Sequence, residues 1–177
     1  MVDDPFVVWF PCLSIGGYRI TSEATPRYNC IAWAAARDDR FWWPDPDAFW
    51  PSGVPSEITL AAFESAFASL GYTRCDSEAL EPLFEKIVIY VNAQGTPTHA
   101  ARQLPNGRWT SKLGRAEDIE HASPDALRGE CYGSPVLVMR RRLQQGFFQA
   151  MRRRIKDMVA RGKSLLPGAE KGSGVFS

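Results

Sequence analysis

One stretch of the N-terminal half has the hydrophobic spacing of an α-helix. Apolar residues recur there at intervals of three or four, at Leu60, Phe63, Phe67 and Leu70. This spacing places the side chains on one face of a helix. Thr59 precedes the pattern as a suitable N-cap, and Gly71 follows it as a stop signal. The pattern therefore predicts a helix over LAAFESAFASL.

Other segments have the patterns of strands and turns. Continuous apolar or β-branched runs, typical of buried strands, occupy residues 6–10 (FVVWF), 86–91 (KIVIYV) and 134–140 (SPVLVMR). THAARQL and WTSKLG flank a turn at residues 105–108, which predicts a β-hairpin. IGGYRI (15–20) predicts a turn and a short strand, and PDAL (124–127) a helical turn.

A second, shorter helix is predicted from the stretch YNCIAWAAA. Asn29 is a good N-cap, and the alanine-rich residues from Cys30 onward favour a helix to about Arg37. FWWPDPDAFWPSG follows as an irregular loop, because it holds three prolines. Its tryptophans either form a substrate-binding wall or cover a core; they are Trp42, Trp43 and Trp50. Together these elements predict one α+β domain over residues 1–141, in which the helix that carries Cys30 packs on a mainly antiparallel sheet.

Composition is that of an ordinary globular domain. The chain has 177 residues, of which 45% are hydrophobic and 23% charged. Acidic residues stand where a signal peptide needs positive charge, and no apolar run is long enough to span a membrane. We therefore expect a cytoplasmic protein, or one exported without an N-terminal signal peptide. The four cysteines form no CxxC pair, which favours free thiols in a reducing compartment.

Charge is distributed unevenly along the chain. Ten of the 21 Lys and Arg residues, but only two of the 20 acidic ones, lie from Met139 onward, so this part carries about +8 and the rest about −7. Residues 142–165 predict a basic amphipathic helix, and residues 166–177 a disordered tail. The helix could dock on the acidic domain, or bind an acidic protein or an anionic membrane. No nucleic-acid motif accompanies its arginines, so nucleic acid is not expected as a partner.

Cys30 and His99 form the candidate catalytic pair. A thiol attacks efficiently only as thiolate, which a helix N-terminus and a neighbouring imidazole both favour. Cys30 follows a predicted N-cap, and His99 precedes a predicted hairpin turn. The alternative is that Cys30 is a small core residue and His99 a satisfied strand histidine.

Hairpin register supplies candidates for the residue that orients the imidazole. A two-residue turn pairs residues whose numbers sum to 213 and brings His99 beside Gly114 and near Lys112. A three-residue turn gives a sum of 212 and places Ser111 on the His99 face. Ser111 is the first choice, because its hydroxyl can accept the imidazole N–H. Asp118 and Gln103 are the alternatives.

An oxyanion hole and a metal site are the remaining questions. The backbone amide of Cys30 is the natural oxyanion donor, and the Asn29 side chain could add a second unless it caps the helix. The second histidine, His121, lacks neighbours at metal-ligand spacing. Neither a metal nor another cofactor is therefore expected.

YNCIAWAAA, the WWP loop, HAARQLPNGRWTSKLG and EDIEH together resemble a largely uncharacterised bacterial family of papain-like domains, similar in outline to CHAP-type amidases. The resemblance covers about residues 28–140. It implies a papain-like fold with Cys30 as nucleophile and His99 as general base. The chain departs from that pattern where papain-like enzymes have an orienting Asn or Asp, since Gly114 and Arg115 stand there.

From the pair and the resemblance we expect a cysteine hydrolase or acyl transferase that acts on an amide, isopeptide or thioester bond of a protein or peptide. The alternative is a non-catalytic protein-binding module that uses the tryptophan loop and the basic helix.

Overall fold

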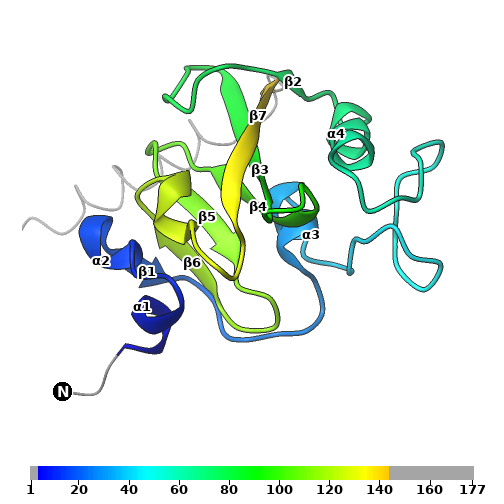
Figure 1. Cartoon of the computed structure of the whole chain (residues 1–177). Coiled ribbons are helices and arrows are strands. Elements are labelled where there is room, and N and C mark those ends of the chain that lie inside the picture. Colours follow the sequence, from blue (N-terminus) through cyan, green and yellow to red (C-terminus); the bar gives the residue numbers. More distant parts are fainter. Residues whose placement is uncertain (1–3, 144–177) are drawn as a thin grey trace, which may run out of the picture. The chain divides into compact units, whose positions relative to one another are not determined.

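The computed structural model describes residues 4–143. Within them, seven strands form one antiparallel sheet in the order β1-β6-β5-β4-β3-β7-β2 (Figure 1). The strands are β1 (Tyr18–Ile20), β2 (Thr73–Arg74), β3 (Phe84–Val91), β4 (Pro97–Gln103), β5 (Trp109–Lys112), β6 (Asp118–His121) and β7 (Ser134–Arg142). The four strands from β3 to β6 follow one another as a meander, so their neighbours in sequence are also neighbours in the sheet.

Short helices lie on both sides of these strands. Figure 1 shows α1 (Pro5–Trp9) and α2 (Leu13–Gly16) on one side, and α3 (Cys30–Ala34) and α4 (Leu60–Ala68) on the other. A 3₁₀ turn, η1 (Pro124–Leu127), packs against α2 and β7. Because side chains alternate along a strand, Ile87 and Ile89 of β3 join the core beneath α3 and α4, whereas Val88 and Tyr90 join the core with α1 and α2. The sheet is thus buried on both faces.

Several predictions from local signals are confirmed. Thr59 caps α4 by accepting from the amide of Ala62 at 3.2 Å. Strands β3 and β7 include the two apolar runs near residues 86–91 and 134–140, and η1 is the expected turn. The hairpin between β4 and β5 has the three-residue turn, because Arg102 pairs with Thr110 and Gln103 with Trp109.

The predicted papain-like fold is wrong. The described residues are dominated by the seven-stranded antiparallel sheet, with only a few short helices around it. The helix that carries Cys30 has five residues and ends at Ala34 rather than near Arg37. It ends because Ala36 adopts a positive φ of 59° and the amide of Arg37 turns back to the carbonyl of Ala32 at 2.9 Å. A helix this short cannot form a principal layer of the fold.

The strand predicted for residues 6–10 is also wrong, since this segment forms α1. Asp4 caps the helix by accepting from the amide of Phe6 at 3.0 Å, and Pro5 occupies its first turn. Both are helix-start signals, and they outweigh the preference of Val7 and Val8 for strands.

The predicted basic helix over residues 142–165 and the predicted tail lie almost entirely outside the described residues. Within residues 4–143, none of the helices has the length and apolar character needed to cross a membrane.

Candidate active site

Cys30 is the first residue of α3, and the residue before it holds that helix in place. The Asn29 side-chain oxygen accepts from the amides of Ala32, at 3.1 Å, and Trp42, at 3.2 Å. Its side-chain nitrogen donates to the carbonyl of Trp42 at 2.7 Å. Asn29 is therefore the helix cap and also the anchor of the tryptophan loop. These bonds use both acceptor positions of its side-chain oxygen but only one of the two N–H donors of its side-chain nitrogen, so the oxyanion role stays a prediction.

The Cys30 thiol is buried, with 7% of the residue exposed. Burial raises its pKa to about 11, against the opposing effect of hydrogen bonds from the amides of Ala100, Ile31 and Cys30 itself and of the positive charge of Lys112. Burial therefore outweighs the effect of the helix N-terminus on the thiol pKa in this structure. The thiol is nevertheless surrounded by groups that would stabilise negative charge.

His99 on β4 begins a chain of hydrogen bonds across the sheet. Its Nε2 lies 3.0 Å from Ser111 Oγ on β5, and the same oxygen lies 2.9 Å from Nε2 of His121 on β6. His121 Nδ1 lies 2.8 Å from the carbonyl oxygen of Ser123. His99, Ser111 and His121 each have 0% exposure. We refer to these three side chains as the histidine relay.

The last acceptor in the relay determines where the protons lie. A carbonyl oxygen can only accept, so His121 carries its proton on Nδ1 and accepts at Nε2. Ser111 then donates to His121 and accepts from His99, which places the His99 proton on Nε2. His99 Nδ1 is left as an unprotonated acceptor, and this buried atom has no hydrogen-bond partner among the described residues. This nitrogen can therefore accept a proton, and none of the described residues donates a hydrogen bond to it.

Both imidazoles are held neutral. Burial, reinforced by the nearby His121, lowers the pKa of His99 well below its usual value. Burial lowers the pKa of His121 to about 4, although the hydrogen bond to Ser123 opposes the change. Neutral imidazole is the form that can act as a general base.

The backbone brings Cys30 and His99 to the same part of the sheet. The ladder between β4 and β5 holds only two residue pairs, and α3 packs against both strands. Ala100, the residue after His99, belongs to the same apolar core as Cys30. Among the described residues no hydrogen bond joins the Cys30 thiol to His99, whose Nδ1 has no partner and whose Nε2 is bonded to Ser111.

Two other predicted candidates lie elsewhere. Gln103 donates its side-chain amide to the carbonyl of Glu78 at 2.8 Å, at the far end of β4. Asp118 accepts from the Tyr28 hydroxyl at 2.6 Å. Neither forms a hydrogen bond with His99, whereas Ser111 does. Within residues 4–143 no cluster of His, Cys, Asp or Glu side chains is arranged to hold a metal ion.

The tryptophans of the irregular loop pack toward the core. Trp42 is buried, and its ring lies 4.7 Å from that of Phe49. Trp43 and Trp50 contact Phe63 of α4, with ring centroids 5.4 Å and 5.1 Å away. These contacts correspond to the core-covering alternative for the loop.

Sequence reasoning missed two residues at this site. His121 had been considered only as a metal ligand, although the registers of two successive hairpins place it on the face of Ser111. The ring of Tyr132 stacks on His99 with centroids 4.0 Å apart and an interplanar angle of 10°. No sequence signal marked Tyr132.

Fold and site together define an antiparallel-sheet protein with a buried thiol, an imidazole with one free nitrogen, and a relay that orients it. The chain belongs to a family of domains of unknown function, DUF7689, whose model matches residues 19–140. That range includes Cys30 and all three residues of the relay. Comparison with curated proteins and with solved structures found no match. The likeness to papain-like cysteine hydrolases stays a prediction from the motifs.

Proposed function

We propose that this protein is a cysteine-dependent hydrolase or acyl transferase that acts on an amide, isopeptide or thioester bond, with Cys30 as nucleophile and His99 as general base. The observation that carries the proposal is the free Nδ1 of His99. The relay occupies the other ring nitrogen, so the imidazole presents a buried, unprotonated nitrogen, and α3, which carries Cys30, packs against the strand of His99.

In this reaction the Cys30 sulfur attacks the carbonyl carbon while its proton moves to His99 Nδ1. The carbonyl oxygen becomes an oxyanion, for which the backbone amide of Cys30 is the proposed donor. When the C=O bond re-forms, the bond to the leaving group breaks, and the leaving atom takes the proton from Nδ1. Cys30 is then acylated, and water or another nucleophile releases the acyl group with His99 again as base.

The perturbed pKa values favour a neutral pair over a thiolate–imidazolium pair. The Cys30 thiol keeps its proton because its pKa is raised, and His99 stays neutral because its pKa is lowered. Proton transfer therefore accompanies attack. Removal of the base should then cost the factor typical of general-base catalysis, about 100-fold or more.

The test is site-selective acylation of the full-length chain by p-nitrophenyl acetate at pH 7.5, followed by peptide mass mapping. We expect acetyl transfer to Cys30 ahead of the other three cysteines, although they are all less buried. His99→Gln should slow acetylation of Cys30 about 100-fold or more, and Ser111→Ala should slow it less.

Cys75→Ser is the matched control, because Cys75 lies away from this site with its sulfur 3.2 Å from the carbonyl of Ser77. It should leave the rate at Cys30 unchanged. Thermal melts establish that each variant is folded. Acetylation that is slower at Cys30 than at the other cysteines, or equal in folded His99→Gln and wild type, would overturn the proposal and favour a non-catalytic binding module.

A further inference from the structure

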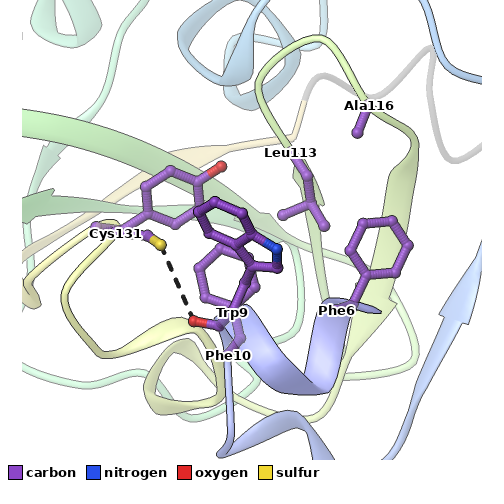
Figure 2. A pocket seen from close by; sticks show the side chains of 7 residues that line it. Phe6, Trp9, Phe10, Leu113, Ala116 and Cys131 are labelled. Carbon is purple, nitrogen blue, oxygen red and sulfur yellow. Dashed lines mark hydrogen bonds between the residues drawn. The ribbon is translucent and has the colours of Figure 1, made fainter. Parts of the chain in front are cut away.

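An apolar pocket lies one aromatic ring away from His99. It has a volume of about 320 Å³ and is lined by Phe6, Trp9, Phe10, Leu113, Ala116, Cys131 and Tyr132 (Figure 2). Its walls come from α1, from the loop between β5 and β6, and from the loop before β7. None of the described residues that line it is charged. A pocket of this size lies near the lower end of small-molecule sites, and an apolar cavity of about 150 Å³ already admits benzene.

Tyr132 separates this pocket from the candidate active site. Its ring stacks on His99 and also on Phe10, whose centroid is 5.0 Å away at an interplanar angle of 28°. One aromatic ring is therefore both a wall of the pocket and the cover of the imidazole. Displacement of this ring would join the pocket to His99.

The loop that carries Tyr132 is closed by a pair of glycines. Gly129 and Gly133 exchange two backbone hydrogen bonds, of 3.0 Å and 2.7 Å, around residues 130–132. The backbone of Tyr132 is fixed as well, because Thr98 donates to its carbonyl at 2.6 Å. Displacement of the ring would therefore come from rotation of the side chain out of its contacts with His99 and Phe10.

Apolar side chains of α1 are also exposed to solvent at and beside the pocket. Val8 is 65% exposed and Trp9 is 64% exposed, although both are large hydrophobic residues. Water-exposed apolar surface next to an apolar pocket is typical of a binding site.

We propose that this pocket binds an apolar group of the substrate, aliphatic or aromatic, and that Tyr132 is the specificity-determining residue between that group and His99. The inference rests on the proposed function in so far as the group belongs to a substrate. The apolar group can be part of the acyl chain or part of the leaving group, and the two sources share the chemistry that the pocket recognises.

The first experiment measures binding alone, so that it does not depend on catalysis. Hexan-1-ol is titrated into the full-length chain and followed by NMR of the aromatic side chains. We expect saturable binding that shifts the Tyr132 and Trp9 signals. Ala116→Phe should fill the pocket and weaken binding about tenfold or more. Ala68→Phe, a substitution at an exposed position on α4, is the matched control and should leave binding unchanged.

The second experiment compares rates of Cys30 acylation, each divided by the rate with free cysteine. One arm compares p-nitrophenyl hexanoate with p-nitrophenyl acetate, which differ in the acyl chain. The other arm compares S-phenyl thioacetate with S-ethyl thioacetate, which differ in the leaving group. We expect at least a tenfold preference for the apolar member in one arm, which identifies the source of the group. Ala116→Phe should abolish that preference, and Ala68→Phe should keep it.

The two proposals fail in different ways. Acylation of Cys30 with no apolar preference in either arm overturns the pocket inference and leaves the proposed function standing. Saturable hexanol binding that Ala116→Phe abolishes, without acylation of Cys30 by any ester, overturns the proposed function but supports the pocket as an apolar binding site. Absence of hexanol binding together with equal rates in folded Ala116→Phe and wild type overturns the pocket inference.

Discussion

A serine hydroxyl that lies between two imidazoles couples the protonation of one to that of the other. Ser111 Oγ can donate one hydrogen bond, and His121 Nε2 receives it because the His121 proton is held on Nδ1 by the carbonyl of Ser123. The same oxygen accepts from His99 Nε2. The two histidines of the chain must therefore be opposite tautomers, His99 protonated on Nε2 and His121 on Nδ1.

Long-range ¹H–¹⁵N correlation spectra of the imidazoles at pH 7.5 can measure this prediction. We expect one ring of each tautomer in the wild-type chain, and loss of the single Nε2-protonated form of His99 in Ser111→Ala. Ser123→Ala is the control, since only the backbone carbonyl of residue 123 takes part in the relay. Identical tautomers in the wild-type chain would contradict the relay.

A residue of the site could be predicted from the sequence when its position depends on a short stretch of the chain. Ser111 was found because one hairpin turn determines which residues face His99, and the observed register has the sum of 212. His121 needed the register of a second hairpin as well. The raised pKa of Cys30 was beyond prediction, because it depends on burial beneath elements distant in sequence.

At the scale of the element, α3 depends on Asn29 more than an ordinary helix depends on its cap. Loss of an N-cap side chain typically costs about 1 kcal/mol. Asn29 also binds the backbone of Trp42 twice, and all these groups are buried. Asn29→Ala should therefore lower the free energy of unfolding by about 3 kcal/mol, because buried backbone groups of the tryptophan loop lose their partners.

Thr59→Ala provides the comparison for this prediction. Thr59 caps α4 through a single bond to the amide of Ala62, so its loss should cost about 1 kcal/mol. Urea denaturation of both variants gives the two values, and an unchanged m-value establishes that they are comparable. Equal losses in the two variants would show that Asn29 acts only as a cap.

The helix α4 was predictable because its signals are local, whereas the length of α3 was misjudged because the chain leaves that helix early. Thr59 and the spacing of Phe63 and Phe67 determine α4 within one segment. The alanines after Cys30 favour helix by propensity, yet the chain leaves the helix at Ala36 to start the tryptophan loop. That early exit leaves only a short helix against the sheet, which is why the papain-like fold was the wrong expectation.

At the scale of the whole molecule, the sheet buries polar groups between two apolar cores. Strand β3 contributes to both cores, and the histidine relay lies across β4, β5 and β6 without exposure to solvent. A buried neutral imidazole makes the free energy of unfolding depend on pH, because the imidazole binds a proton readily in the unfolded chain but not in the folded chain. The histidine relay should therefore make the free energy of unfolding of the entire domain depend on pH.

The direction of this effect follows from the lowered pKa values of His99 and His121. Above the ordinary histidine pKa of about 6.5, both states are neutral and the contribution is fully present. As pH falls below that value, only the unfolded chain is protonated, so stability is lost, and the loss continues down to about 4 for His121. At pH 5.5 each histidine should cost about 1.4 kcal/mol relative to pH 7.5. Most carboxylates are still ionised there, so two histidines account for a loss of about 3 kcal/mol in urea denaturation.

His121→Gln, which keeps a polar side chain without titrating, should roughly halve the loss. Equal stability of the wild-type chain at the two pH values would mean that these imidazoles accept protons in the folded state, and His99 could not then be the neutral base that the proposed reaction requires.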